Sequence, residues 1–87
     1  MKKAIYSKLF AKKLDKLDKK QLSNVLNKLD EILLRDDLNF YKNLRNDLKK
    51  YKRVHVNNSY VVLFYGENNY VYFVDYEHHD KIYKKKL

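Results

Sequence analysis

The sequence has no cysteine, no proline and a single glycine in 87 residues. The absence of cysteine excludes disulfides, zinc sites built from thiolates and thiol nucleophiles, and it fits a reducing compartment. With one glycine and no proline, the chain is expected to form long regular elements joined by short turns. Hydrophobic residues make up 45% of the sequence and aromatic residues 15%, which is enough for a core although 36% of the residues are charged. We therefore expect one globular domain over residues 1–87.

A long apolar segment is also missing. The longest apolar run, Tyr60 to Tyr65, is far shorter than the roughly 20 residues that cross a bilayer as a helix. The lysine-rich N-terminus is not followed by the apolar stretch of a signal peptide. We therefore expect a cytoplasmic protein that has no contact with a membrane.

Acidic residues are scarce relative to basic ones. The chain has 11 Asp and Glu against 20 Lys and Arg, which gives a net charge of +9. The basic excess lies in three segments, residues 1–22, 41–56 and 78–87, which could converge on one face of the protein. Such a field would steer the protein toward nucleic acid or an acidic protein. The alternative is a solvated lysine surface that only keeps the protein soluble.

The first half of the chain predicts a short strand followed by a helical hairpin. Residues 2–6 are an extended segment, and Ser7 is placed to cap a helix over residues 8–17, where leucines recur at helical spacing. A capping-box pattern begins a second helix at Asp18, and an apolar i, i+3, i+4 pattern carries it to about Arg35. Residues further along, up to position 50, have weaker periodicity and predict a loop or a short helical turn.

The second half predicts a three-strand antiparallel meander. Apolar and polar or cationic residues alternate over residues 51–56, and apolar runs follow at residues 60–65 and 70–76. The turns between them, residues 57–59 and 66–69, contain Asn and Gly, which tolerate positive φ. The predicted fold is α+β, with an N-terminal strand and a helical hairpin packed on one face of a mostly antiparallel sheet of three to four strands. The opposite face is left for a partner.

The first strand of the meander is expected to carry cations on that opposite face. Val54 and Val56 should point to the core, and Arg53 and His55 should point away from it, because successive strand residues face opposite sides of a sheet. A basic sheet face on a basic protein suggests a polyanion as the partner.

The order and spacing of these features resemble the RelE/ParE superfamily of toxins from bacterial and archaeal toxin–antitoxin pairs. The resemblance covers nearly the whole chain and implies a single RelE-like domain of the microbial-RNase-like type. It also implies an acidic RelB-like antitoxin as partner in a hetero-oligomer. Besides the helical hairpin, it rests on four sequence patterns: Leu44-Arg45 followed by Leu48, Arg53-Val54-His55-Val56, the turn into Tyr60, and His79-Asp80-Lys81-Ile82-Tyr83.

The resemblance further implies an activity and its residues. The RelE branch enters the ribosomal A site and cuts mRNA there, whereas the ParE branch inhibits DNA gyrase. In the RelE branch, residues on the first two meander strands and after the last strand surround the scissile phosphate. Carried over to this sequence, the catalytic positions are Arg53, His55, His79 and Tyr83. Further RNA contacts are expected from the nearby residues Lys49, Lys50, Lys52, His78 and Lys81.

Two positions qualify this assignment. Lys52 would replace Arg53 at the site if the strand register were shifted by one residue. The position after Tyr60 is often Arg in the family, but here it is Val61, so one cation next to the phosphate is missing. The activity is therefore expected to be weaker than in relatives that keep this Arg.

The proposed residues suit the chemistry. Attack by a ribose 2′-hydroxyl needs a proton acceptor, a proton donor and cations near the phosphate. Histidine exchanges protons near neutral pH, and Arg53 can make two parallel hydrogen bonds to phosphate, so this route requires no metal and no cofactor. The run Glu77-His78-His79-Asp80 could suggest a metal site, but neighbours in sequence rarely converge on one ion.

Other interpretations remain open at the level of sequence. Arg53 and His55 could be solvated residues on an exposed sheet face, and Tyr83 could be a core residue in a chain with nine tyrosines. The first functional hypothesis is a ribosome-dependent, metal-independent mRNA endonuclease that inhibits translation. The second is a non-catalytic gyrase inhibitor of the ParE type or a degenerate toxin that only binds its antitoxin. The third is an RNA-binding module without catalysis.

Overall fold

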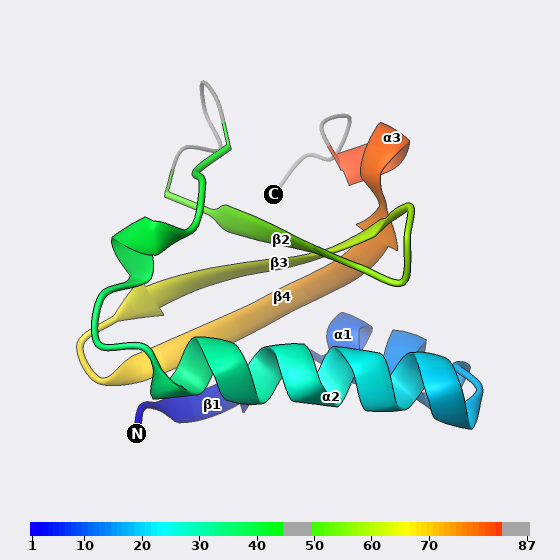
Figure 1. Cartoon of the computed structure of the whole chain (residues 1–87), viewed down its shortest axis with the longest axis horizontal. Coiled ribbons are helices and arrows are strands. Elements are labelled where there is room, and N and C mark those ends of the chain that lie inside the picture. Colours follow the sequence, from blue (N-terminus) through cyan, green and yellow to red (C-terminus); the bar gives the residue numbers. More distant parts are fainter. Residues whose placement is uncertain (45–49, 83–87) are drawn as a thin grey trace.

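The structure, a computed structural model, describes residues 1–44 and 50–82. These residues form a sheet with two long helices on one face and a short helix after the last strand (Figure 1). The strands are β1 (Lys3–Tyr6), β2 (Lys52–Val56), β3 (Tyr60–Glu67) and β4 (Tyr70–His78). The helices are α1 (Lys8–Asp15), α2 (Lys19–Leu34) and α3 (His79–Ile82), with a 3₁₀ turn, η1 (Leu38–Phe40), before β2. The predicted α+β fold is confirmed.

The sheet has four strands in the order β1-β4-β3-β2. The pairs β2–β3 and β3–β4 are antiparallel hairpins, which confirms the predicted meander, and β1 lies parallel to β4. Both turns use left-handed asparagines, with φ of 54° and 63° at Asn57 and Asn58 and 58° at Asn68. Asparagine tolerates this conformation better than most residues, which explains why these turns can be tight without glycine.

Both long helices begin where their caps were predicted. Ser7 Oγ accepts a hydrogen bond from the Phe10 N–H at 2.9 Å and donates one to the Val74 carbonyl at 2.6 Å. Asp18 Oδ1 accepts from the Gln21 N–H at 2.8 Å. Helix α1 ends at Asp15, two residues earlier than predicted, because residues 16–17 form the turn that brings Asp18 into its capping position.

The larger of two apolar clusters lies between the helices and the sheet. It contains the fully or almost fully buried residues Phe10, Val25, Leu29, Ile32, Leu33, Tyr41, Val56, Val62, Phe64, Val71, Phe73 and Tyr76. Helix α2 contributes four of these residues at i, i+4, i+7 and i+8 positions, which is the apolar face that the sequence predicted. No helix among the described residues is long and apolar enough to cross a membrane.

A smaller cluster covers part of the other face of the sheet. It contains Leu44, Val61, Leu63 and Ile82. The run Tyr60 to Tyr65 is apolar on both faces of β3, so this side also needs a cover, and the residues before β2 and helix α3 provide it. The face that the sequence left for a partner is therefore only partly open.

Candidate active site

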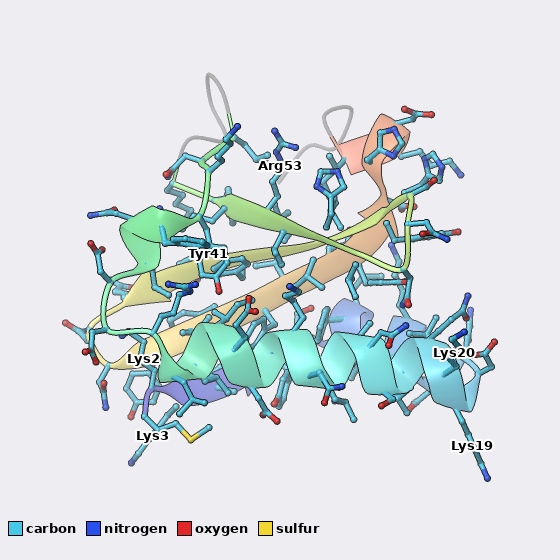
Figure 2. The ribbon with its side chains drawn as sticks, in the orientation of Figure 1. Lys2, Lys3, Lys19, Lys20, Tyr41 and Arg53 are labelled. Carbon is cyan, nitrogen blue, oxygen red and sulfur yellow. The ribbon has the colours of Figure 1, made fainter. Side chains whose placement is uncertain are left out.

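Arg53 and His55 lie on the face of β2 opposite the long helices. Their cross-strand partners on β3 are Leu63 and Val61, which belong to the smaller apolar cluster. Figure 2 shows the Arg53 side chain pointing away from α2. The side-chain alternation that the sequence predicted for this strand therefore holds.

Lys52 lies on the helix side of β2, together with Val54 and Val56, and only 8% of it is exposed. Its ammonium group donates hydrogen bonds to the Asn43 Oδ1 at 2.8 Å and to the Tyr41 carbonyl at 3.4 Å. An ammonium held in this way is unavailable to RNA unless these bonds break. We therefore leave Lys52 out of the candidate site. In the observed strand register, the residues of β2 that face the site are Arg53 and His55.

The turn between β2 and β3 positions His79. The carbonyl of Ser59 accepts a hydrogen bond from the His79 backbone N–H at 2.8 Å and another from His79 Nδ1 at 3.0 Å. A carbonyl can only accept, so Nδ1 carries the proton. The other ring nitrogen, Nε2, lies 2.9 Å from Asp80 Oδ1. These contacts place the His79 ring beside that of His55, with 6.2 Å between the ring centroids.

The pKa of His55 is lowered from its ordinary value of 6.5. Partial burial of the imidazole is the largest cause, and the positive charges of Arg53 and His79 add to it. All three effects disfavour the imidazolium form. His55 is therefore neutral at pH 7 and can accept a proton there.

The remaining predicted residues occupy different places. The His78 ring packs edge-on against Tyr60 at 5.5 Å and stacks on the His79 ring at 4.7 Å. Exposed Lys50 lies over the rings of Tyr51 and Tyr65, with its ammonium 5.0 and 4.8 Å from their centroids. Lys81 is exposed on α3. Lys49 and Tyr83, and with them the predicted anchor Leu48, lie outside the described residues.

The family position that often holds Arg is part of the core here. Val61 is fully buried and lies directly opposite His55 in the β2–β3 register. It packs in the smaller cluster with Leu63 and Ile82. At the position of the missing cation, the protein therefore has an apolar side chain that packs next to the strand carrying His55.

A hollow beside Arg53 was not foreseen from the sequence. It has a volume of about 300 Å³ and is lined by Phe40, Tyr41, Lys42, Arg53, Val54 and His55. Phe40 is 65% exposed, and the Arg35 guanidinium lies 3.6 Å from the centroid of its ring. The signal in the sequence was the aromatic and basic run Phe40-Tyr41-Lys42, which stands in a segment without clear periodicity.

The basic segments do not all converge on this site. Figure 2 shows Lys19 and Lys20 at the N-terminal end of α2, whereas Lys2 and Lys3 lie near its other end. All four lie away from Arg53 (Figure 2). The possible convergence of the three basic segments on one face therefore does not include these four lysines, because Lys2 and Lys3 lie at β1 and Lys19 and Lys20 lie on α2.

Comparison with solved structures identifies the fold. The toxin–antitoxin complex RelBE of E. coli contains a similar chain, with a TM-score of 0.74 and 14% identity over 90% of this chain and 96% of that one. For the RelB-RelE complex of Methanococcus jannaschii the TM-score is 0.70, with 19% identity over 92% and 95% of the two chains. The ParDE system of P. aeruginosa gives 0.68, with 8% identity over 90% and 96%. The fold is that of the RelE-like toxins.

Comparison with known sequences identifies the family. No family model matches the sequence. A curated protein of Methanocaldococcus jannaschii, whose name RelE4 places it among the RelE toxins, is 51% identical over 76 residues, which cover 85% of this chain and 79% of that protein. At this identity and coverage, the chain belongs to the RelE toxin family.

Proposed function

We propose that this toxin is an endoribonuclease that cuts ribosome-bound mRNA without a metal ion and so inhibits translation. The observation that carries the proposal is the convergence of Arg53 and His55 from β2 with His79 from α3. These residues supply a permanent cation and two imidazole rings. That set of groups meets the needs of RNA cleavage by the neighbouring 2′-hydroxyl.

In the proposed reaction, neutral His55 accepts the proton of the ribose 2′-hydroxyl. The 2′-oxygen attacks the adjacent phosphorus, the bond to the 5′-oxygen of the next nucleotide breaks, and that oxygen takes up a proton from solvent water. Arg53 contacts the phosphate oxygens as their negative charge grows. The products are a 2′,3′-cyclic phosphate and a 5′-hydroxyl.

His79 has a supporting electrostatic role in this proposal. When protonated, it donates Nδ1–H to Ser59 and Nε2–H to Asp80, which fixes a positive charge beside His55. Tyr83, implied by the family resemblance, is proposed to contact the same phosphate and lies outside the described residues. Further RNA contacts are proposed from the basic residues Lys49, Lys50, His78 and Lys81.

The hollow beside Arg53 is proposed to hold a base next to the cleaved phosphate. Single-stranded RNA is commonly bound by stacking of its bases on aromatic rings and guanidinium planes. Phe40 is exposed at this hollow and is already packed against the Arg35 guanidinium. Its contribution is stacking, which accepts any base, so it would add affinity rather than codon preference.

The test is a reconstituted translation reaction in which ribosomes stop with an empty A site and the mRNA 5′ ends are mapped. Cleavage within the A-site codon is expected in the presence of a chelator. Arg53→Ala should abolish it, whereas Lys3→Ala, which removes an exposed cation away from the site, should not. Intact mRNA with the unaltered protein would exclude the proposal.

A second candidate is inhibition of DNA gyrase without catalysis. Two observations favour it: the buried Val61 removes a cation from the site, and the similar ParDE structure shows that this fold alone does not distinguish the two branches. Supercoiling by purified gyrase, measured with and without the toxin, separates the two. Inhibition of supercoiling together with intact mRNA would establish this second function.

We further propose an acidic RelB-like antitoxin as the partner and the cytoplasm as the place of action. The similar E. coli and Methanococcus jannaschii structures are toxin–antitoxin complexes, and the charge of +9 complements an acidic chain. A groove of about 450 Å³ offers the apolar part of such an interface, lined by Tyr6, Phe10, Ala11, Leu14, Asp15, Leu17, Leu22 and Leu26. An amphipathic antitoxin helix would fit this surface.

The interface has a direct test. Leu26 lines the groove and is 45% exposed, whereas Leu34, on the same helix, is 66% exposed and does not line it. Leu26→Asp should weaken the complex with the proposed acidic RelB-like antitoxin, and Leu34→Asp should leave it unchanged. Equal affinities for both variants would place the interface elsewhere.

A further inference from the structure

One ring nitrogen of His79 lies close to the carboxylate of the next residue, Asp80. The Ser59 carbonyl takes the Nδ1 proton of His79, so in the neutral ring the lone pair lies on Nε2. That nitrogen is 2.9 Å from Asp80 Oδ1. An imidazole nitrogen and a carboxylate oxygen are both donors to divalent metal ions, so this pair of atoms is a candidate for metal binding.

A third ligand atom lies close by. The second oxygen of Asp80, Oδ2, is 3.6 Å from His78 Nδ1, which also accepts a hydrogen bond from the Asp80 backbone N–H at 3.2 Å. One ligand atom from each of His78, His79 and Asp80 lies within 4.8 Å of the others. In a tetrahedral zinc site with bonds of about 2.0–2.1 Å, the ligand atoms are roughly 3.3 Å apart. The separations of 2.9 Å to Oδ1 and 3.6 Å to Oδ2 lie on either side of this value, and an ion would bind after side-chain rotation, in place of the Asp80 N–H contact to His78 Nδ1.

The backbone explains why three consecutive residues converge. Strand β4 ends at His78 and helix α3 begins at His79, so the chain bends between them. The two imidazole rings therefore stack, with 4.7 Å between centroids, instead of pointing to opposite sides as they would along a strand. A regular strand or helix would not bring these three side chains together.

The surroundings of His79 match those of a metal ligand. A histidine that binds a metal usually donates its other ring N–H to a carbonyl or carboxylate, which fixes the tautomer and the orientation of the ring. Ser59 already provides this contact. The side chains of His78, His79 and Asp80 are 32%, 44% and 72% exposed, so an ion can enter, and a fourth coordination position stays open to water.

We propose that His78, His79 and Asp80 bind one divalent transition-metal ion of the zinc class, and that this ion inhibits the toxin. Two imidazoles and one carboxylate are the donor types that Zn²⁺, Cu²⁺ and Ni²⁺ prefer. The inhibitory part rests on the proposed function: an ion held by these side chains would stand beside His55 and exclude the RNA from that edge of the site. Free metal ions would then restrain an enzyme whose cleavage requires none.

Binding is tested without reference to activity. Tag-free protein is titrated with Co²⁺, whose visible absorption reports coordination, and with Zn²⁺ by calorimetry. We expect one saturable site, and Asp80→Asn and His79→Gln should each weaken it at least about tenfold, as for lost metal-site contacts in general. Two matched controls, His55→Gln and Asp30→Asn on α2, should bind the ion as the unaltered protein does.

Two outcomes would overturn the binding proposal. One is the absence of saturable binding, which would mean that these three side chains hold no ion. The other is binding that is the same in Asp80→Asn and His79→Gln as in the unaltered protein, which would place the ion elsewhere. All the substituted side chains are at least partly exposed, and circular dichroism checks that each variant is folded.

The inhibitory part has its own readout. Zn²⁺ at a saturating concentration should stop mRNA cleavage, a chelator should restore it, and the residual cleavage of Asp80→Asn should be insensitive to the ion. Saturable binding without any effect on cleavage would overturn inhibition and leave the site established. If the unaltered protein cuts no mRNA under any condition, the proposed function fails, whereas the Co²⁺ and Zn²⁺ titrations still decide the metal site.

Discussion

Arg53 is the cation with the most specific role in the proposed site. It is one of three arginines among twenty basic residues, and only arginine can contact two phosphate oxygens in a planar, bidentate way. Its place on β2, beside His55, gives it a proposed role that the numerous lysines do not share. The single substitutions at this site are therefore informative.

Arg53→Lys should reduce cleavage about tenfold or more, although the charge is kept, because the second hydrogen bond to phosphate is lost. The rate of mRNA cleavage in the reconstituted reaction measures the effect. Lys81→Arg, on exposed α3, is the converse control and should change the rate little. Equal rates for Arg53→Lys and the unaltered protein would show that only charge matters at this position.

The lowered pKa of His55 predicts how the cleavage rate depends on pH. Because the proposed base must be neutral, the rate should fall on acidification only below pH 6.5, the ordinary histidine value. Removing the neighbouring positive charge in Arg53→Ala should move the pKa of His55 upward. NMR titration of the His55 imidazole resonances, with a chelator present, measures the pKa of His55 in the unaltered protein and in Arg53→Ala. A downward shift in Arg53→Ala would contradict the assigned cause.

At the scale of the elements, α1 is joined to β4 by an ionic contact. Lys13 Nζ lies 2.7 Å from the fully buried Asp75 carboxylate and 3.1 Å from that of Glu77. Burial of Lys13 lowers its pKa, but the hydrogen bonds to both carboxylates outweigh this effect, and the pKa is raised above 10.5. The contact therefore stabilises the folded state at neutral pH and is lost only as the pH rises through this raised value.

Lys13→Met should lower the free energy of unfolding by about 1–3 kcal/mol, because a buried carboxylate loses a partner. Lys12→Met, an exposed substitution on the same helix, should change it by less than about 0.5 kcal/mol. Urea denaturation at pH 7 measures both. The difference between the two variants should shrink when the pH exceeds the pKa of Lys13, and a difference that persists there would assign the effect to packing.

The two helix caps should differ in strength. Ser7 both caps α1 and donates a hydrogen bond to β4, whereas exposed Asp18 only caps α2. Ser7→Ala should therefore lower the free energy of unfolding by about 2 kcal/mol and Asp18→Ala by about 1 kcal/mol. Thermal unfolding of the two variants compares them directly. A larger effect of Asp18→Ala would show that the tie to the sheet contributes little.

The sequence was most informative where the signal is local. Both caps, the apolar face of α2 and the asparagine turns depend on residues within a few positions of each other, and all were predicted. The features that the sequence did not predict depend on contacts between residues that are far apart in the chain. The burial of Lys52 is set by Tyr41 and Asn43, and the second apolar cluster by Leu44 and Ile82.

The same distinction applies to the site. The alternation along β2 correctly placed Arg53 and His55 on one face. No local rule could show that His79 would be held by the Ser59 carbonyl, because that contact joins α3 to a turn distant in sequence. The hollow at Phe40 was missed for a similar reason, since one side of it comes from η1 and the other from β2.

For the molecule as a whole, charge governs how fast a partner associates. With a net charge of +9, the association rate with an acidic antitoxin should fall steeply as salt is raised from about 50 to 500 mM, while the dissociation rate changes less. Stopped-flow mixing at several salt concentrations measures both rates. An association rate independent of salt would mean that the apolar groove, not the basic surface, guides the encounter.

The three residues of the β2–β3 turn contact several other elements of the fold. Asn57 donates hydrogen bonds to the Gln21 carbonyl on α2 and to the Tyr76 hydroxyl on β4, while Ser59 holds His79. The same turn sets which face of β2 carries Arg53, because a shift of one residue moves every side chain to the other face. An insertion here that shifts β2 by one position would thus turn Arg53 and His55 toward the helices and Val54 and Val56 away from the core, so the proposed catalytic groups and part of the core packing depend on the length of one turn.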